Sequence, residues 1–268
     1  MEGKKIYFLS DIHLGNKYSD NPLAVEKKLV RWLDGIKDEA CAIYFLGDVF
    51  DYWYEYKYIV PRGHVRFLGK LAELSDKGIE IHLFTGNHDI WMFDYLPKEI
   101  GAVIHRQPLE TNLFGRKFFL GHGDETGYRP FKYRMIQSIF QSRICQILYA
   151  SIHPRWTFAF AHRWSLSSRI SGLKTEKIKI AQKRNLQYLK AFALSYLETH
   201  QDVSYFIFGH LHILVNEELT PTSNLVIIGD WMQHFSYAVW DGEKIIIESD
   251  AEAISCKYPT INSYEYLL

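Results

Sequence analysis

Phe208-Gly209-His210-Leu211-His212 is the stretch on which the interpretation of this sequence depends. The hydrophobic run that begins at Tyr205 leads straight into the glycine, as a buried strand leads into a turn. The glycine lets the backbone turn tightly there. With that turn, two imidazoles spaced two residues apart can reach into one small volume. The stretch therefore predicts a strand that ends at a binding site.

Four earlier hydrophobic runs end in a similar way, in Gly or Ser followed by Asp, Asn or His. These four strand ends are Ser10-Asp11-Ile12-His13 after residues 6–9, Gly47-Asp48 after 42–46, Gly86-Asn87-His88-Asp89 after 79–84, and Gly121-His122 after 117–120. Ligands bind at the carboxyl ends of strands in layered α/β proteins. We therefore expect all five strand ends to meet in one site.

The rest of the chain supplies helices between these strands. Apolar residues at helical spacing predict helices over residues 22–36 and 64–75, and the second should stop near Gly78. Later strands are expected at 225–228 and in a hairpin of 237–240 and 244–247, turned by Asp241-Gly242. The mixture predicts an α/β fold.

A basic segment interrupts the pattern. From Tyr128 to His200 strand signals vanish, and residues 126–200 hold 13 Lys and Arg against two acids, a net charge of +11. The chain as a whole has a formal net charge of zero, so the remainder is acidic. Such asymmetry indicates that the segment faces something anionic: phosphate, nucleic acid or a membrane surface. We expect one catalytic domain, residues 1–125 with 201–268, and a helical lid or insertion, residues 126–200.

The cysteines and the lack of targeting signals indicate the cellular compartment of the protein. Cys41, Cys145 and Cys256 are scattered and odd in number, which fits a reducing compartment. The N-terminus lacks the apolar region of a secretory signal. No apolar run approaches the ~18 residues that span a bilayer. These features predict a cytoplasmic protein, either free or peripheral on the inner membrane.

The five strand ends together offer oxygen and nitrogen donors suited to metal ions. The seven donors are Asp11, His13, Asp48, Asn87, His122, His210 and His212. A set without cysteine matches a pair of divalent first-row ions rather than a structural zinc site. Two ions bridged by an aspartate lower the pKa of a bridging water and hold phosphoryl oxygens. We expect Mn²⁺, with iron or zinc as alternatives, and a phosphate-ester hydrolase.

These motifs resemble a known superfamily. Asp11-x-His13, Gly47-Asp48-x-x-Asp51, Gly86-Asn87-His88-Asp89, Gly121-His122 and Gly209-His210-x-His212 are similar to the five motifs of the calcineurin-like metallophosphoesterases. The resemblance implies a four-layer αββα sandwich with the basic helical segment inserted in it. It also implies that Asp11, His13 and His212 hold one metal ion. Asn87, His122 and His210 would hold the other, and Asp48 would bridge the two.

The resemblance further implies three residues that act without binding metal. His88 would lie near the leaving-group oxygen, as a general acid or a stabiliser of developing charge. Asp51 and Asp89 would orient the ligands or His88.

Within the superfamily, the sequence is most similar to the UDP-2,3-diacylglucosamine hydrolases of lipid A synthesis. The similarity rests on residues 47–53, on the short spacing between motifs and on the basic insertion after Gly121-His122-Gly123-Asp124. It implies cleavage of a lipid-linked nucleotide to UMP and 2,3-diacylglucosamine 1-phosphate. The insertion would receive the acyl chains and contact an anionic membrane surface. The best-known members carry arginine where this chain has His88.

Three other functions are compatible with parts of the sequence. The protein could be a metal-dependent phosphodiesterase or phosphatase for a nucleotide, a phosphoprotein or another soluble ester. It could bind nucleic acid through the basic segment, with steep salt dependence. It could also be an inactive metal-bound scaffold. Because all seven donors are present, we expect an enzyme and no nucleic-acid partner.

Two smaller features remain open. The aromatic residues 52–58 either form a wall for acyl chains or pack under the insertion. Asp230 follows a strand, and we interpret it as a turn residue rather than a ligand. The sequence carries no signal for the oligomeric state.

Overall fold

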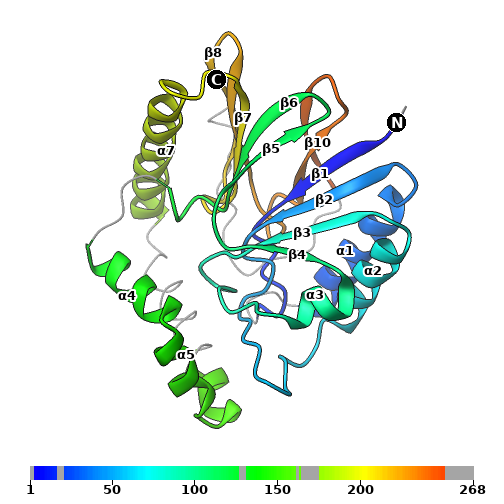
Figure 1. Cartoon of the computed structure of the whole chain (residues 1–268), viewed down its shortest axis with the longest axis vertical. Coiled ribbons are helices and arrows are strands. Elements are labelled where there is room, and N and C mark those ends of the chain that lie inside the picture. Colours follow the sequence, from blue (N-terminus) through cyan, green and yellow to red (C-terminus); the bar gives the residue numbers. More distant parts are fainter. Residues whose placement is uncertain (1–2, 17–20, 127–130, 161–162, 164–174, 251–268) are drawn as a thin grey trace.

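The computed structural model describes residues 3–16, 21–126, 131–160, 163 and 175–250 (Figure 1). Within these residues the strands form one six-stranded and one five-stranded sheet. The first has the order β11-β10-β1-β2-β3-β4, and the second has the order β5-β6-β7-β9-β8. The chain crosses between the sheets after β4 and again after β9.

The strands have the following bounds. In the first sheet they are β1 Lys5–Leu9, β2 Ala40–Leu46, β3 Glu80–Phe84, β4 Val103–His105, β10 Ser236–Trp240 and β11 Ile245–Ser249. In the second they are β5 Leu109–Leu113, β6 Arg116–Leu120, β7 Val203–Phe208, β8 Leu214–Thr220 and β9 Ser223–Ile228. β1 to β4 run parallel, and so do β6, β7 and β9.

Helices cover the outer faces of both sheets. They are α1 Pro22–Ile36, α2 Val65–Asp76 and α3 Tyr95–Ile100 beside the first sheet, and α7 Thr175–Leu197 beside the second (Figure 1). α1 begins as its sequence predicts, with Pro22 in the first turn and the Asn21 side chain accepting from the backbone N–H of Ala24.

Alternation along the strands produces three hydrophobic clusters, one at each interface between layers. Tyr7 and Leu9 of β1 pack with α1 and α2, whereas Ile6 and Phe8 face the second sheet. A third cluster joins the outer face of the second sheet to α7. Three interfaces require four layers, so the predicted αββα sandwich is confirmed.

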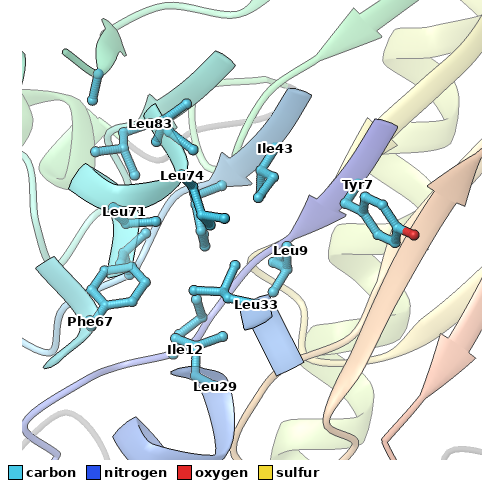
Figure 2. Packing of buried hydrophobic residues seen from close by; sticks show 14 of the residues in the cluster. Tyr7, Leu9, Ile12, Leu29, Leu33, Ile43, Phe67, Leu71, Leu74 and Leu83 are labelled. Atoms are coloured by element: carbon cyan, nitrogen blue, oxygen red, sulfur yellow. The ribbon is translucent and has the colours of Figure 1, made fainter. Parts of the chain in front are cut away.

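The cluster between the first sheet and helices α1 to α3 fixes this sheet against its helices. Figure 2 shows Leu29 and Leu33 of α1 and Leu71 of α2 directed toward residues of β1 and β2. These three side chains are fully buried. Each contributes roughly 1.5–3 kcal/mol to stability through its burial. The strand ends that follow this packed core therefore start from well-fixed positions.

The expected helices and the hairpin are confirmed, but four elements were not predicted. Three of them, β4, β5 and β8, are edge strands of the two sheets. An edge strand has one solvent-facing side, and β8 reads Leu-Val-Asn-Glu-Glu-Leu-Thr, without a long apolar run. The fourth, α3, spans only six residues.

Within the predicted insertion, residues 126–200, most of the described residues are helical. α4 Phe131–Gln141, α5 Arg143–Ala150 and helical residues 154–160 lie apart from the two sheets (Figure 1). Residues 127–130, 161–162 and 164–174 lie outside the described residues. Leu186 and Leu189 of α7 pack on the second sheet, so the second half of that helix contributes to the main core. The division of the chain at residues 125 and 200 stays a prediction.

Among the helices that the structure describes, none has the length and apolarity required to cross a membrane. Cys41 and Cys145 are free thiols, while Cys256 falls beyond residue 250.

Candidate metal centre

The loops after β1, β2, β3, β6 and β7 all leave the carboxyl ends of parallel strands. Such ends meet at one edge of each sheet, and the two sheets of the sandwich bring these edges together. The predicted ligands lie in these loops, and their side chains form one cluster. The expectation that the five strand ends converge is therefore confirmed.

Asp11, His13 and His212 form the first group that could hold a metal ion. One donor atom from each lies within 4.8 Å of the others. His212 Nε2 is 3.3 Å and His13 Nε2 is 3.9 Å from Asp11 Oδ1. The two imidazole rings are stacked, with centroids 5.5 Å apart. These are the residues that the resemblance assigns to one ion.

A second group consists of Asp11, Asp48 and His122, again with donor atoms within 4.8 Å of one another. Asp48 Oδ2 lies 3.6 Å from His13 Nε2 and 3.5 Å from His122 Nε2. It therefore lies between His13 of the first group and His122 of the second, where a bridging carboxylate would have to be. The ligands of each ion stay a prediction.

The other two predicted ligands lie beside His122. Asn87 Oδ1 is 3.2 Å from His122 Nε2, and the His210 ring centroid is 5.0 Å from that of His122. His122 Nδ1 lies 2.8 Å from the backbone carbonyl of Leu46, which can only accept. Nδ1 therefore carries the hydrogen and Nε2 is directed at the cluster.

A buried carboxylate oxygen without a hydrogen bond shows that the donors fit a divalent ion. Asp11 Oδ1 is buried and accepts no hydrogen bond from the residues that the structure describes. A buried oxygen of this kind costs free energy unless something satisfies it. A cation between Asp11 and the neighbouring imidazoles would do so.

The backbone is strained at most of the predicted ligands. Five of the eight non-glycine residues with positive φ in the described part of the chain belong to the predicted set. They are Asp11 (54°), His13 (48°), Asp48 (52°), His210 (65°) and His212 (52°). A left-handed residue costs of order 1–3 kcal/mol and persists only where the surroundings impose it. The strain is therefore concentrated at the candidate site.

The motif glycines are required because side chains approach the backbone there. A Cβ added to Gly209 would lie 1.8 Å from Ser10 Oγ, and one added to Gly86 would lie 2.2 Å from Asp48 Oδ1. Neither distance is possible between atoms that are not bonded to each other. The glycines thus make room for the carboxylates and for the residues that orient them.

Asp48 and His122 form a charged pair in this buried environment. Burial alone would raise the pKa of Asp48, but the positive fields of His122, His88 and His13 outweigh burial and hold it well below its usual value. Burial likewise opposes protonation of His122, but Asp48 raises the pKa of His122 well above its usual value. The carboxylate at the proposed bridging position is therefore strongly stabilised in its charged form.

His88 lies at the edge of the cluster, half-buried and held by two contacts. Its Nδ1 is 3.1 Å from the backbone carbonyl of Asp51, and its backbone N–H donates to Asp48 Oδ1 at 2.8 Å. The Asp51 carboxylate lies 3.9 Å from the same Nδ1 and 3.6 Å from His13 Nδ1. Asp51 thus lies close to both imidazoles, and its role in orienting them stays a prediction.

Asp89 is buried, and its carboxylate contacts the backbone. It accepts the N–H of Gly86 at 2.8 Å and those of Val49 and Phe50 at 2.8 and 3.2 Å. Burial and the negative charge of Asp48 raise the pKa of Asp89 to about 7. Asp89 therefore ties the loop after β2 to the loop after β3.

Asp230 is the main residue that sequence reasoning missed. Its Oδ1 accepts the backbone N–H groups of residues 232–234, so the predicted turn is present. Its Oδ2, however, lies 3.1 Å from His212 Nδ1 and 3.3 Å from His234 Nδ1. A signal existed in the sequence, because Gly229-Asp230 follows β9 just as the other motifs follow their strands.

Tyr52 and Tyr54, which follow Asp51, contact the predicted insertion. The Tyr52 hydroxyl lies 3.0 Å from that of Tyr149, and the Tyr54 hydroxyl donates to the carbonyl of Gln146 at 2.7 Å. Tyr52 also lines a cavity of about 750 Å³ together with Asp51, which connects the site to this cavity.

Comparisons with known proteins agree with this geometry. The family model of the calcineurin-like phosphoesterases matches residues 4–214. The chain is 47% identical to a UDP-2,3-diacylglucosamine hydrolase of Porphyromonas gingivalis, over 91% of this chain and 97% of the relative. It is 25% identical to the hydrolase of the same name in Aeromonas salmonicida, over 87% and 88% of the two chains.

A solved phosphoesterase structure from E. coli is also similar, with 14% identity, a TM-score of 0.44 and 94% of this chain and 96% of that chain covered. The match of the family model over most of the sequence, together with the relative at 47% identity, identifies the family. The chain belongs to the calcineurin-like phosphoesterases.

Proposed function

We propose that this protein hydrolyses the pyrophosphate bond of UDP-2,3-diacylglucosamine, giving UMP and 2,3-diacylglucosamine 1-phosphate. The observation that carries the proposal is the 47% identity to the P. gingivalis hydrolase of that name over almost the whole of both chains. The cluster of oxygen and nitrogen donors at the strand ends supports the same chemistry.

Two divalent ions would be held by the predicted ligands, with Asp48 between them. When bound, such ions supply an activated water and neutralise charge on phosphoryl oxygens. We propose Mn²⁺ for both positions, because oxygen and nitrogen ligands without thiolate suit it. The strained loops and the buried carboxylates keep these donors in place before the ions arrive.

The chain's own residues would then assist the departure of the leaving group. His88 Nδ1 is engaged by the Asp51 carbonyl, which leaves Nε2 to pass a proton to the oxygen of the departing phosphate. The Asp51 carboxylate, close to both His88 and His13, would keep the two rings in their orientations.

A cavity next to the metal centre would hold the acyl chains of the substrate. The cavity of about 750 Å³ begins at Asp51 and Tyr52 and is lined by apolar side chains that include Leu23, Val60 and Phe158. An acyl chain attached to a substrate at the metal centre would extend into it and bury apolar surface there.

The insertion would contact the membrane that holds this substrate. Phe131, Ile144, Leu148 and Trp156 expose 77, 71, 63 and 66% of their surface. Residues 126–175 contain no acidic residue, and exposed Arg134, Arg143 and Arg155 accompany the apolar side chains. A basic surface with exposed apolar groups suits an anionic bilayer surface. We propose a peripheral position on the cytoplasmic side of the inner membrane.

The test is a substrate panel on purified protein with added Mn²⁺. We expect release of UMP from UDP-2,3-diacylglucosamine in detergent, measured by mass spectrometry, and loss of this activity on chelation. A soluble chromogenic phosphodiester should be a poorer substrate. Turnover of the soluble diester without turnover of the lipid nucleotide would contradict the proposal and favour a soluble phosphodiesterase.

A further inference from the structure

Residues 57–66, called the 57–66 segment below, carry an apolar and basic surface on the catalytic domain itself. Tyr58, Ile59 and Val65 expose 85, 52 and 75% of their surface. Lys57, Arg62 and Arg66 are exposed beside them, and the segment contains no acidic residue. Exposed apolar groups normally occur singly and among charges of both signs, so this composition indicates an interaction.

The segment lies opposite the insertion across one cavity. Residues 59–64 form one wall of the cavity of about 750 Å³, while residues 153–155 and Phe158 form another. Figure 1 shows the end of the insertion that follows α5 and the loop after β2 at the same end of the molecule. The cavity between them continues to Asp51 in the candidate metal centre.

The exposed surfaces next to the two walls have the same chemistry. On the segment, Lys57 Nζ lies 5.0 Å from the ring centroid of Tyr58. On the insertion, Arg155 Cζ lies 6.0 Å from the ring of Trp156, and Ile152 is 47% exposed nearby in sequence. Aromatic rings beside cationic groups are characteristic of the interface between a bilayer and water, where each residue has one apolar and one wet end.

We infer that the 57–66 segment is a second membrane contact, so that the protein meets an anionic lipid surface with both walls of the cavity at once. A lipid substrate would then move from the bilayer directly into the cavity between the walls. The inference rests on the proposed function for the identity of that substrate. The membrane contact itself rests on the exposed apolar side chains and on the positive charge, which complements anionic headgroups.

The experiment uses the full-length, metal-loaded protein and two double variants. Tyr58→Ser/Val65→Ser removes apolar surface, and Lys57→Gln/Arg66→Gln removes charge; none of these residues lines the cavity. Val103→Ser is the matched control, because Val103 is 48% exposed but begins β4, at the end of the parallel strands away from the ligand loops. Partition is measured by sedimentation with vesicles of phosphatidylcholine, with and without phosphatidylglycerol.

We expect the Tyr58/Val65 variant to bind the mixed vesicles about tenfold more weakly, and the Lys57/Arg66 variant to lose the preference for phosphatidylglycerol. Hydrolysis of a soluble phosphodiester should stay at the wild-type rate in both, and Val103→Ser should match wild type throughout. Equal partition of wild type and the Tyr58/Val65 variant would overturn the inference. So would a wild-type protein that does not bind these vesicles, or a variant that changes only the oligomeric state.

The two proposals fail separately. If the variants lose vesicle binding but the wild type does not cleave UDP-2,3-diacylglucosamine in detergent, the proposed substrate is wrong and the membrane contact stands. If the wild type cleaves the detergent-solubilised substrate but the variants bind vesicles as the wild type does, the membrane contact is wrong and the proposed substrate stands.

Discussion

Asp230 Oδ2 lies 3.1 Å from Nδ1 of His212, so a carboxylate outside the predicted ligand set holds one of the predicted ligands. A hydrogen-bonded carboxylate fixes the orientation of an imidazole and leaves the other nitrogen, here Nε2, for the metal ion. Both oxygens of Asp230 are occupied in this way or by backbone N–H groups. The residue therefore combines a turn with the support of a ligand.

Asp230→Asn should weaken metal binding without abolishing the fold. Loss of a carboxylate behind a ligating histidine typically costs 10–100-fold in metal affinity, and we expect a loss of about that size. Competition with a chromogenic chelator measures it. Asp241→Asn is the control, because Asp241 accepts two backbone N–H groups in the β10–β11 turn and has no predicted ligand beside it in sequence. If both variants kept wild-type metal affinity, Asp230 would be a turn residue only.

Asp48→Asn tests the proposed bridge. The amide keeps an oxygen to accept the backbone N–H of His88, so the loop should hold its position, but the negative charge between the two groups is lost. We expect metal content per chain to fall well below wild type and hydrolysis to disappear, with elemental analysis as the measurement. Asp94→Asn, at an exposed aspartate paired with Lys98, should have neither effect. Two ions per chain in Asp48→Asn would remove the bridging assignment.

His88→Ala separates chemistry from metal binding. His88 is assigned to the leaving group and not to an ion, so metal content should stay near wild type. The rate should fall by ~10²–10⁴-fold, the usual contribution of a positioned acid or base. Loss of metal in this variant would show that His88 is a ligand. His88→Arg is informative as a companion, because activity retained in it would connect this position to the substrate phosphate rather than to proton transfer.

Gly86→Ala should be far more damaging than an ordinary glycine replacement. The new Cβ would lie 2.2 Å from Asp48 Oδ1 and 2.5 Å from Asp48 N, so the loop after β3 has to move away from Asp48. We expect a loss of ~1–3 kcal/mol or more in the free energy of unfolding, together with loss of metal. Gly35→Ala in α1 has no heavy atom near the new Cβ and should stabilise the protein by ~0.5–1 kcal/mol. Urea unfolding of both variants provides the comparison, and equal stability of the two would refute the steric argument.

The sequence was sufficient to predict that the five strand ends converge, because each predicted donor closely follows a buried strand. Asp11 and Asp48 could be placed together from two strand ends alone, since the parallel strands β1 and β2 end at one edge of a sheet. His122 follows β6 of the second sheet, so its approach depends on how the two sheets pack. The close approach of Asp48 to Gly86 and the contact of Asp89 with the backbone depend on how two loops pack. No local pattern encodes such distances.

The sequence was less informative where an element owes its structure to a neighbour. β8 is a strand because it pairs with β9, and its own residues Glu217 and Glu218 would not predict one. Tyr52 and Tyr54 owe their positions to a distant segment, because their hydroxyl groups contact Tyr149 and Gln146, about 95 residues later in the chain. Asp230 was undervalued for the same reason, because its partner His212 lies 18 residues earlier in the chain.

His105, which is outside the predicted ligand set, provides a prediction about pH. It ends β4, and its Nε2 lies 3.0 Å from Nδ1 of His82 on the neighbouring strand. Burial, with a smaller effect of His82, lowers the pKa of His105 from 6.5 to about 4. Burial also lowers the pKa of His82, although Glu80 beside it acts in the opposite direction. Both rings are therefore neutral in the folded protein at neutral pH.

In the unfolded chain His105 binds a proton once the pH falls below about 6.5, whereas in the folded protein it binds one only when the pH falls to about 4. The unfolded state then holds more protons, so the free energy of unfolding must fall as the pH drops through this window. Because His105 is only half-buried, we expect its share to be roughly 1–2 kcal/mol, less than the full shift would give. Urea unfolding of the metal-free protein at several pH values measures the slope. His105→Phe, which keeps a ring stacked on Phe84, should flatten the slope, and an unchanged slope would show that other groups cause the acid sensitivity.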